Sequence, residues 1–223
     1  MSEDPKTFLE DNDFTRRLRA IAGDLWGAAP KPAAPADVAA EPKPPKAKPK
    51  KVVLEQPKTD LTNLWKTADE TIDWTEALAH GAPRDGLADE RMWGFFHRIA
   101  EKVLSGDLKA YTEVLTAVNP LGELTEFADE IRIQARSPEL LETRFVCKPE
   151  LMAENAEGYL SAMGLRMARD LFACLPVSQV KIQAKEQGKP VMEITYDRDQ
   201  LKHINFNFVD PLTFAKECGM KME

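Results

Sequence analysis

The sequence has no long apolar run and few cysteines. Because no stretch of about 18 consecutive apolar residues occurs, we expect no transmembrane helix. The N-terminus is acidic and lacks the apolar core of a secretory signal; it reads MSEDPKTFLEDND. These two absences predict a soluble protein that resides in the cytoplasm.

Residues that typically hold metals or cofactors are also scarce. The three cysteines, Cys147, Cys174 and Cys218, are far apart in sequence and odd in number, which argues against a disulfide framework and against a zinc site. None of the three histidines has a second ligand at metal spacing, and the chain has no glycine-rich phosphate loop and no nucleophile elbow. We therefore expect no resident metal and no cofactor.

The composition changes abruptly near residue 30. Residues 30–51 contain seven prolines, and their six lysines and two acidic residues give this stretch +4 on a chain whose net charge is −7. Proline at this density excludes helix interiors and central strands, and almost no large apolar residue is present. We predict a disordered linker over 28–58, which separates an N-terminal helix segment at 1–27 from a globular α+β domain at 59–223.

The N-terminal segment carries an apolar stripe. Its members are spaced by four, three and four residues, as on one face of a helix, and a tryptophan extends the end of the stripe. A lone helix of this length is marginal in water, so the stripe needs a surface to pack on. We predict a partner-binding face made of Phe14, Leu18, Ile21, Leu25 and Trp26. Docking on another protein, folding back on its own domain and self-association all remain open.

The globular part begins with helices over 59–119. Two short helices are expected near 60–68 and 71–81, followed by a helical hairpin over 89–119. Gly106 lies where the first helix of the hairpin should end, and Asp107 is a suitable cap for the second.

The remainder, 120–223, alternates between apolar and polar residues in a way that predicts strands. A long helix is expected from 149 to about 174, and a last short helix after Asp210. Short turns favour antiparallel neighbours, and polar outward positions favour a sheet with one solvent-exposed face. The fold class is therefore α+β in two layers: a helical hairpin plus an antiparallel sheet of about five strands, covered on one face by the long helix. The predicted strands are 130–136, 140–147, 177–185, 191–197 and 204–208.

Carboxylates near the strands suggest an alternative function. A Mg²⁺-dependent nuclease needs an Asp and a following Glu-x-Lys to hold the metal and orient water. Here the tripeptides that begin at Glu142 and at Glu193 both lack the lysine at their third position. A metal-dependent enzyme acting on nucleic acid, with a site around Glu142, Glu193 and Asp197, remains the second hypothesis.

A nucleic-acid-binding module is the third hypothesis. It would use the lysines of 43–51 and a mildly basic polar face of the sheet. However, the linker has no aromatic residue to stack on bases, and the sheet aromatics are expected on the apolar side. A net anionic chain also disfavours non-specific contact with a phosphate backbone. A nucleic-acid partner is therefore not expected.

The C-terminal half resembles a domain of uncharacterised bacterial proteins. The shared features are an Asn-Pro-Leu-Gly turn at 119–122 and a helix that ends on RDLFACLP and leads into a strand. The resemblance spans about half the chain and implies a bacterial, Gram-positive source. It implies no activity, so no functional residue is carried over.

The leading hypothesis follows from the organisation of the chain. A separable amphipathic helix, a long spacer and the absence of a catalytic motif are typical of a non-enzymatic protein-interaction or adaptor protein. The expected partner is a protein that binds the N-terminal helix, and no membrane partner is expected. The oligomeric state is left open.

Overall fold

The computed structural model describes residues 60–81 and 90–223. The predicted N-terminal helix and linker lie outside the described residues. Within the described part, no helix combines the length and apolar character needed to cross a bilayer. The elements, in chain order, are η2 (Leu64–Lys66), α2 (Trp74–Ala79), α3 (Glu90–Leu104), α4 (Leu108–Val118), η3 (Gly122–Glu126), β1 (Ala128–Ser137), β2 (Leu140–Cys147), α5 (Pro149–Cys174), β3 (Gln179–Glu186), β4 (Lys189–Asp197), α6 (Arg198–Leu201), α7 (Pro211–Glu217) and β5 (Lys221–Met222).

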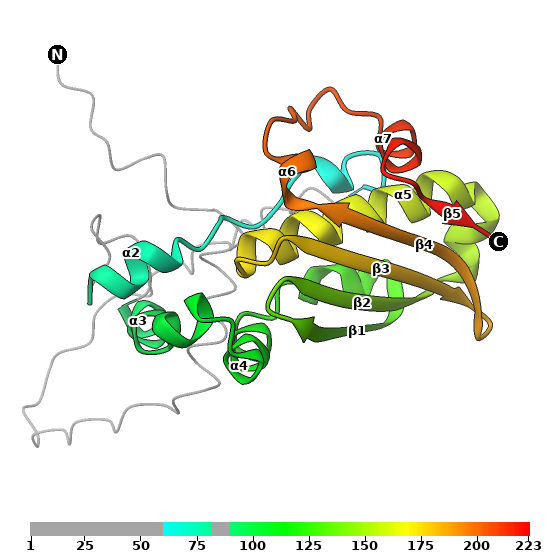
Figure 1. The fold of residues 1–223 in the computed structure, drawn as a ribbon. Coiled ribbons are helices and arrows are strands. Elements are labelled where there is room, and N and C mark those ends of the chain that lie inside the picture. The colour runs from blue at the N-terminus through cyan, green and yellow to red at the C-terminus, as the bar shows by residue number, and fades with distance from the viewer. Residues whose placement is uncertain (1–59, 82–89) are drawn as a thin grey trace, which may run out of the picture.

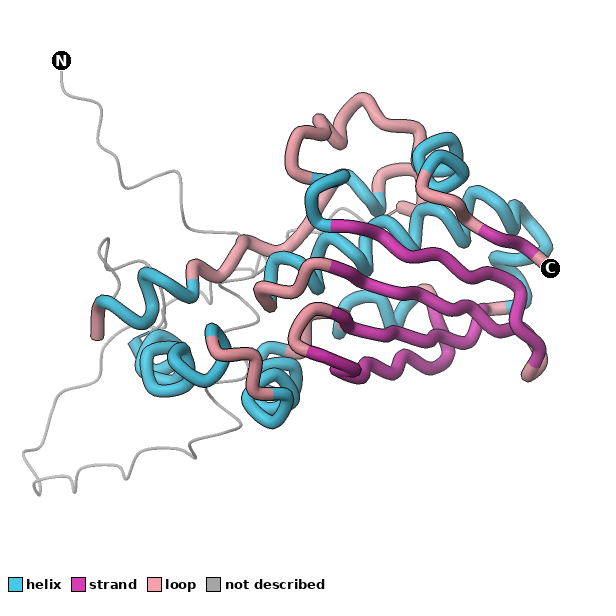
Figure 2. The backbone as a smooth tube through the Cα atoms, viewed as in Figure 1, coloured by secondary structure: helices cyan, strands magenta, loops and turns pink. Residues whose placement is uncertain are grey.

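The described strands form one five-stranded sheet with the order β1-β2-β3-β4-β5 (Figure 2). The predicted α+β class is confirmed. Three of the four neighbouring pairs are antiparallel, as expected, but β2 and β3 are parallel. The reason is α5, which connects them as a crossover and returns the chain to the end of the sheet where β2 began.

Helix α5 covers one face of the sheet, as Figure 1 shows. The strand residues that point toward it are fully buried, among them Leu141, Phe145, Ile182 and Tyr196. Alternate residues of the same strands are exposed or half-buried, which is the predicted two-layer arrangement with one solvent-exposed face. The two faces differ because side chains alternate along a strand.

The predicted strand at 204–208 is wrong, since this segment forms a loop of turns. Asn205 explains the difference: its side-chain oxygen accepts from the amide of Asn207 at 3.2 Å, and its carbonyl accepts from the amide of Phe208 at 3.0 Å. Such local bonds compete with a strand ladder. The edge of β4 is instead taken by β5. Phe208, expected on the apolar side, is 87% exposed.

The C-terminal end of α5 is completed by residues far away in sequence. The amide of Ile72 donates to the carbonyl of Ala173 at 2.9 Å, and the indole of Trp74 donates to the carbonyl of Cys174 at 3.0 Å. The guanidinium of Arg198 donates to two further carbonyls nearby. The last carbonyls of a helix lack partners within the helix, so these bonds fix the segment before α2 against α5.

A buried ion pair lies further back along α5. The Nε of Arg166 donates to Asp170 at 2.6 Å, and both side chains are almost fully buried. The other oxygen of Asp170 accepts from the amide of Asp69 at 3.0 Å, while Arg166 also donates to the hydroxyl of Thr67. The pair therefore attaches the segment after η2 to α5.

The helical hairpin contacts the sheet at the β1–β2 turn. Gly106, between α3 and α4, has φ +79°, and a Cβ placed on it would lie 2.6 Å from the Cβ of Pro138. The hydroxyl of Tyr111 donates to the carbonyl of Pro138 at 3.1 Å. Glycine is thus required at 106 both by its backbone conformation and by the close contact.

Candidate functional site

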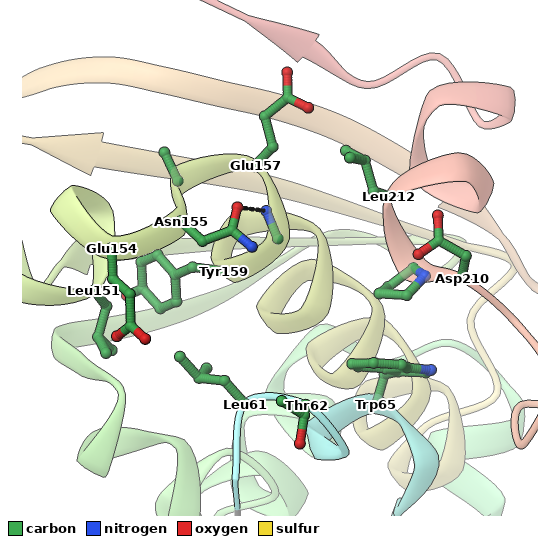
Figure 3. Close-up of a pocket in the computed structure, with 13 residues that line it drawn as sticks. Leu61, Thr62, Trp65, Leu151, Glu154, Asn155, Glu157, Tyr159, Asp210 and Leu212 are labelled. Carbon is green, nitrogen blue, oxygen red and sulfur yellow. Dashed lines mark hydrogen bonds between the residues drawn. The ribbon is translucent and has the colours of Figure 1, made fainter.

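A groove of 650 Å³ lies between three segments that are distant in sequence. It is formed by the residues around η2, by the first part of α5 and by the start of α7, as Figure 3 shows. Its size falls within the range of about 300–1,000 Å³ that is typical of binding sites for small ligands or short segments. The lining residues are Leu61, Thr62, Trp65, Leu151, Glu154, Asn155, Ala156, Glu157, Gly158, Tyr159, Asp210, Pro211 and Leu212.

The floor of the groove is apolar. Leu61, Trp65, Leu151 and Leu212 contribute half-buried side chains, and the ring of Tyr159 is buried beside them. The indole nitrogen of Trp65 donates to the carbonyl of Val209 at 3.2 Å, which holds the ring between η2 and the entrance to α7. Half-buried apolar side chains gathered in one concavity favour a ligand with an apolar surface of its own.

A break in α5 shapes one wall of the groove. Asn155 has φ −159° and ψ 83°, which are not helical, and its side-chain oxygen accepts from the amide of Gly158 at 3.0 Å (Figure 3). This is how an asparagine caps the start of a helix, so α5 restarts at Ala156. A Cβ on Gly158 would lie 2.3 Å from the Asn155 amide nitrogen, and glycine leaves room for the cap.

The rim of the groove is acidic. Glu154, Glu157 and Asp210 are exposed and surround the opening on different sides (Figure 3). Hydrogen bonds from the Thr213 hydroxyl and then from its amide lower the pKa of Asp210, so this carboxylate stays ionised at neutral pH. Glu157 also pairs with Lys216 at 3.1 Å on the surface. An apolar floor with such a rim suits an apolar stripe flanked by basic residues.

The predicted partner-binding residues, Phe14, Leu18, Ile21, Leu25 and Trp26, lie outside the described residues. Sequence patterns did not reveal the groove itself. Leu61 and Trp65 fit the apolar pattern of a short helix, but only the folded chain brings them beside the first part of α5 and the start of α7. Such a meeting of distant segments leaves no periodic signal in the sequence.

The carboxylates of the metal-site hypothesis are each engaged by other side chains. Glu142 accepts from Arg136 at 2.5 Å, and Glu193 pairs with Lys181 at 2.9 Å. Asp197 accepts from a glutamine amide at 2.8 Å. Among the described residues, no group of three His, Cys, Asp or Glu side chains could hold a metal ion. The described residues around Glu142, Glu193 and Asp197 therefore provide no carboxylate cluster that would support the hypothesis of a metal-dependent enzyme.

The pairing of Glu142 makes a prediction about acid stability. Hydrogen bonding from Arg136, aided by Arg144, lowers the pKa of Glu142 below its ordinary 4.5. A depressed folded-state pKa stabilises the fold above about pH 4.5, and this contribution is lost as the pH falls through the folded-state value. The variant Glu142→Gln should be less stable than the wild type at pH 7 and match it at the acid end, as measured by urea unfolding. A stability difference that does not vary with pH would contradict the pairing.

Comparisons of this chain with protein-family models, with curated proteins and with solved structures find no match. The assignment of the described residues as an α+β domain with a groove therefore rests on their own geometry alone. The resemblance of the C-terminal half to bacterial domains stays a prediction.

Proposed function

We propose that this chain is a non-enzymatic protein-interaction or adaptor protein, with a recruitment helix at its N-terminus and a groove for that helix on its domain. The observation that carries the proposal is the groove, with its apolar floor and its rim of Glu154, Glu157 and Asp210. Helix-in-groove recognition, in which an amphipathic helix lays its apolar face into such a surface, is a recurring mode of binding.

The occupant that we propose for the groove is residues 14–26 of this chain. The stripe of Phe14, Leu18, Ile21 and Leu25 would face the floor formed by apolar side chains. The arginines at 16, 17 and 19 lie mostly off this stripe, where they would meet the acidic rim. Complementary charge of this kind favours one docking orientation and speeds association more than it raises affinity.

Chain connectivity supports docking within one molecule. The predicted spacer ends at residue 58, three residues before Leu61, which itself lines the groove. The 31 residues from 28 to 58 would reach roughly 100 Å as an extended polyproline-type chain, so the spacer imposes no strain. A tether that starts beside its own binding site raises the local concentration of the helix to about the millimolar range.

The groove then gives the adaptor a resting state. The recruitment helix lies on its own domain until a partner with a better surface for the same stripe competes for it. A partner must overcome the intramolecular contact, so the apparent affinity of the full chain is lower than that of the isolated helix.

A labelled peptide of residues 10–28 tests this proposal by fluorescence anisotropy with the full-length chain. Wild-type chain should bind the peptide weakly, because its own helix occupies the groove. The variant Leu18→Glu/Ile21→Glu, which disrupts the stripe, should bind the peptide about tenfold more tightly or better, since the competing segment no longer docks. The matched control Ala20→Glu, on the opposite side of the predicted helix, should behave as wild type.

Two further variants test whether the groove is the surface that binds the peptide. In the stripe-disrupted chain, Leu212→Glu should abolish peptide binding, whereas Leu78→Glu should leave it unchanged, because Leu78 is an exposed leucine on α2 that does not line the groove. If the stripe-disrupted chain does not bind the peptide, the groove is not the site of this helix. Concentration-dependent dimerisation of the wild type that the peptide reverses would instead assign the occupant to a second copy.

A further inference from the structure

A second concavity, separate from the groove, is lined by basic and amide side chains. Its volume is 480 Å³, and it lies between the end of η2, the middle of α5 and the loop after α6. No carboxylate is among its lining residues, although the whole chain carries −7. The polar side chains that line it are Lys66, Arg169, Lys202, His203, Asn205 and Asn207.

Arg169 is the centre of this arrangement. Its guanidinium donates to the carbonyls of Trp65 and Thr67, and the ring of Phe206 lies 3.9 Å from its central carbon. Burial lowers the pKa of Arg169 to about 10, so the group stays charged at neutral pH. Its hydrogen bonds go to neutral carbonyls, and the carboxylate of the neighbouring Asp170 acts on it electrostatically while pairing directly with Arg166. A half-buried cation that shares its nearest carboxylate with a second arginine gains from a bound anion.

Two other arginines near α5 have different surroundings. Arg166 pairs with the buried carboxylate of Asp170, and Arg198 donates to carbonyls at the negative end of the helix. Arg169 lines a concavity that also presents Lys66 and Lys202. An anionic ligand there would balance three cationic side chains at once.

The loop over 202–207 supplies the remaining donors. In its turn, the backbone amide of Asn207 donates to the side-chain oxygen of Asn205, and both asparagines line the concavity. Lys202 pairs with Asp199 at 2.6 Å, but both side chains are largely exposed, so this pair is weak and readily exchanged for a ligand. Phe208, in the same loop, leaves an aromatic ring 87% exposed.

We propose that this concavity binds the phosphate group of a small phosphorylated molecule of mononucleotide size. Arginine and lysine side chains line the concavity together, and such side chains form charge-assisted bonds to phosphate oxygens. The volume matches the small-molecule range of about 300–1,000 Å³. Phe208 directly follows the lining residue Asn207, and its exposed ring is one on which a base could stack, as aromatic side chains do for nucleic-acid bases.

Isothermal titration calorimetry of the full-length chain with AMP, adenosine and inorganic phosphate tests the proposal. AMP should bind with a dissociation constant of about 1 mM or tighter, and adenosine at least tenfold more weakly, because the phosphate supplies the charge-assisted contacts. Raising the salt concentration should weaken the binding of AMP. A chain that binds adenosine as well as AMP, or that binds neither, would overturn the proposal.

Surface variants assign the site. Lys66→Ala and Lys202→Ala should each weaken AMP binding about fivefold, in line with the loss of one charge-assisted bond, while Lys189→Ala, at the distant β3–β4 turn, should not. Unfolding curves of these lysine variants should match the wild type, which separates lost binding from lost folding. Equal losses of AMP affinity in all three variants would mean that the lysines act only through the net charge of the chain, which would contradict a specific site. Tight binding of single-stranded DNA without binding of AMP would point to a nucleic-acid surface instead.

Discussion

The variant Asp170→Ala should lose about 3–5 kcal/mol of unfolding free energy, the typical cost of leaving one member of a buried ion pair without its partner. Asp170 is fully buried and accepts from Arg166 at 2.6 Å. It also accepts from the amide of Asp69, which joins the segment before α2 to α5. The variant therefore leaves the buried guanidinium with the more distant carboxylate of Glu123, at 3.6 Å, and removes one of the bonds that hold that segment to α5. Urea unfolding followed by circular dichroism measures the loss.

A double variant separates the lost charge partner from lost packing. Arg166→Met/Asp170→Leu removes both charges and keeps apolar volume, so it should recover at least half of the stability that Asp170→Ala loses. If the double variant is as unstable as the single one, the segment is held by the backbone bond of Asp69 rather than by the charge balance.

Replacing Gly106 with alanine should cost about 3 kcal/mol, from a left-handed backbone that alanine disfavours and from overlap with a neighbour. Gly106 has φ +79°, and an added Cβ would lie 2.6 Å from Pro138. The hairpin of α3 and α4 would have to move away from the β1–β2 turn. Thermal unfolding should show a lowered midpoint.

Gly188 provides a matched control for the contact. It has φ +82°, but a Cβ added there meets nothing within 4 Å. The variant Gly188→Ala should therefore cost only the backbone term, about 1 kcal/mol. Equal losses of stability in the two variants would mean that the hairpin moves away from Pro138 at no cost. The close contact at Gly106 would then contribute nothing to the effect of Gly106→Ala.

Local signals predicted much of the fold. The long helix was expected over 149–174 and spans Pro149–Cys174, because the proline at its first position and the Leu-Pro after it are both encoded locally. The four longer strands were also predicted, to within two residues at each end. Their alternation follows directly from one buried face and one exposed face.

Non-local relations were not predictable in the same way. The parallel pairing of β2 with β3 depends on where α5 returns the chain. At 204–208 the alternation was genuine, but Asn205 bonds within its own loop and Phe206 packs on Arg169. A pattern of apolar residues cannot tell a ring that faces a core from one that faces a guanidinium. The groove likewise depends on three distant segments.

The layout of the groove has a consequence during synthesis on the ribosome. Its lining extends from Leu61 to Leu212. Residues 14–26 are synthesised before any of these lining residues, and the groove cannot be complete until Asp210–Leu212 have followed. If the proposed docking holds, the N-terminal stripe has no groove to occupy while residues 27–212 are being made. A partner that binds this stripe would then meet no internal competitor until residue 212 has been synthesised.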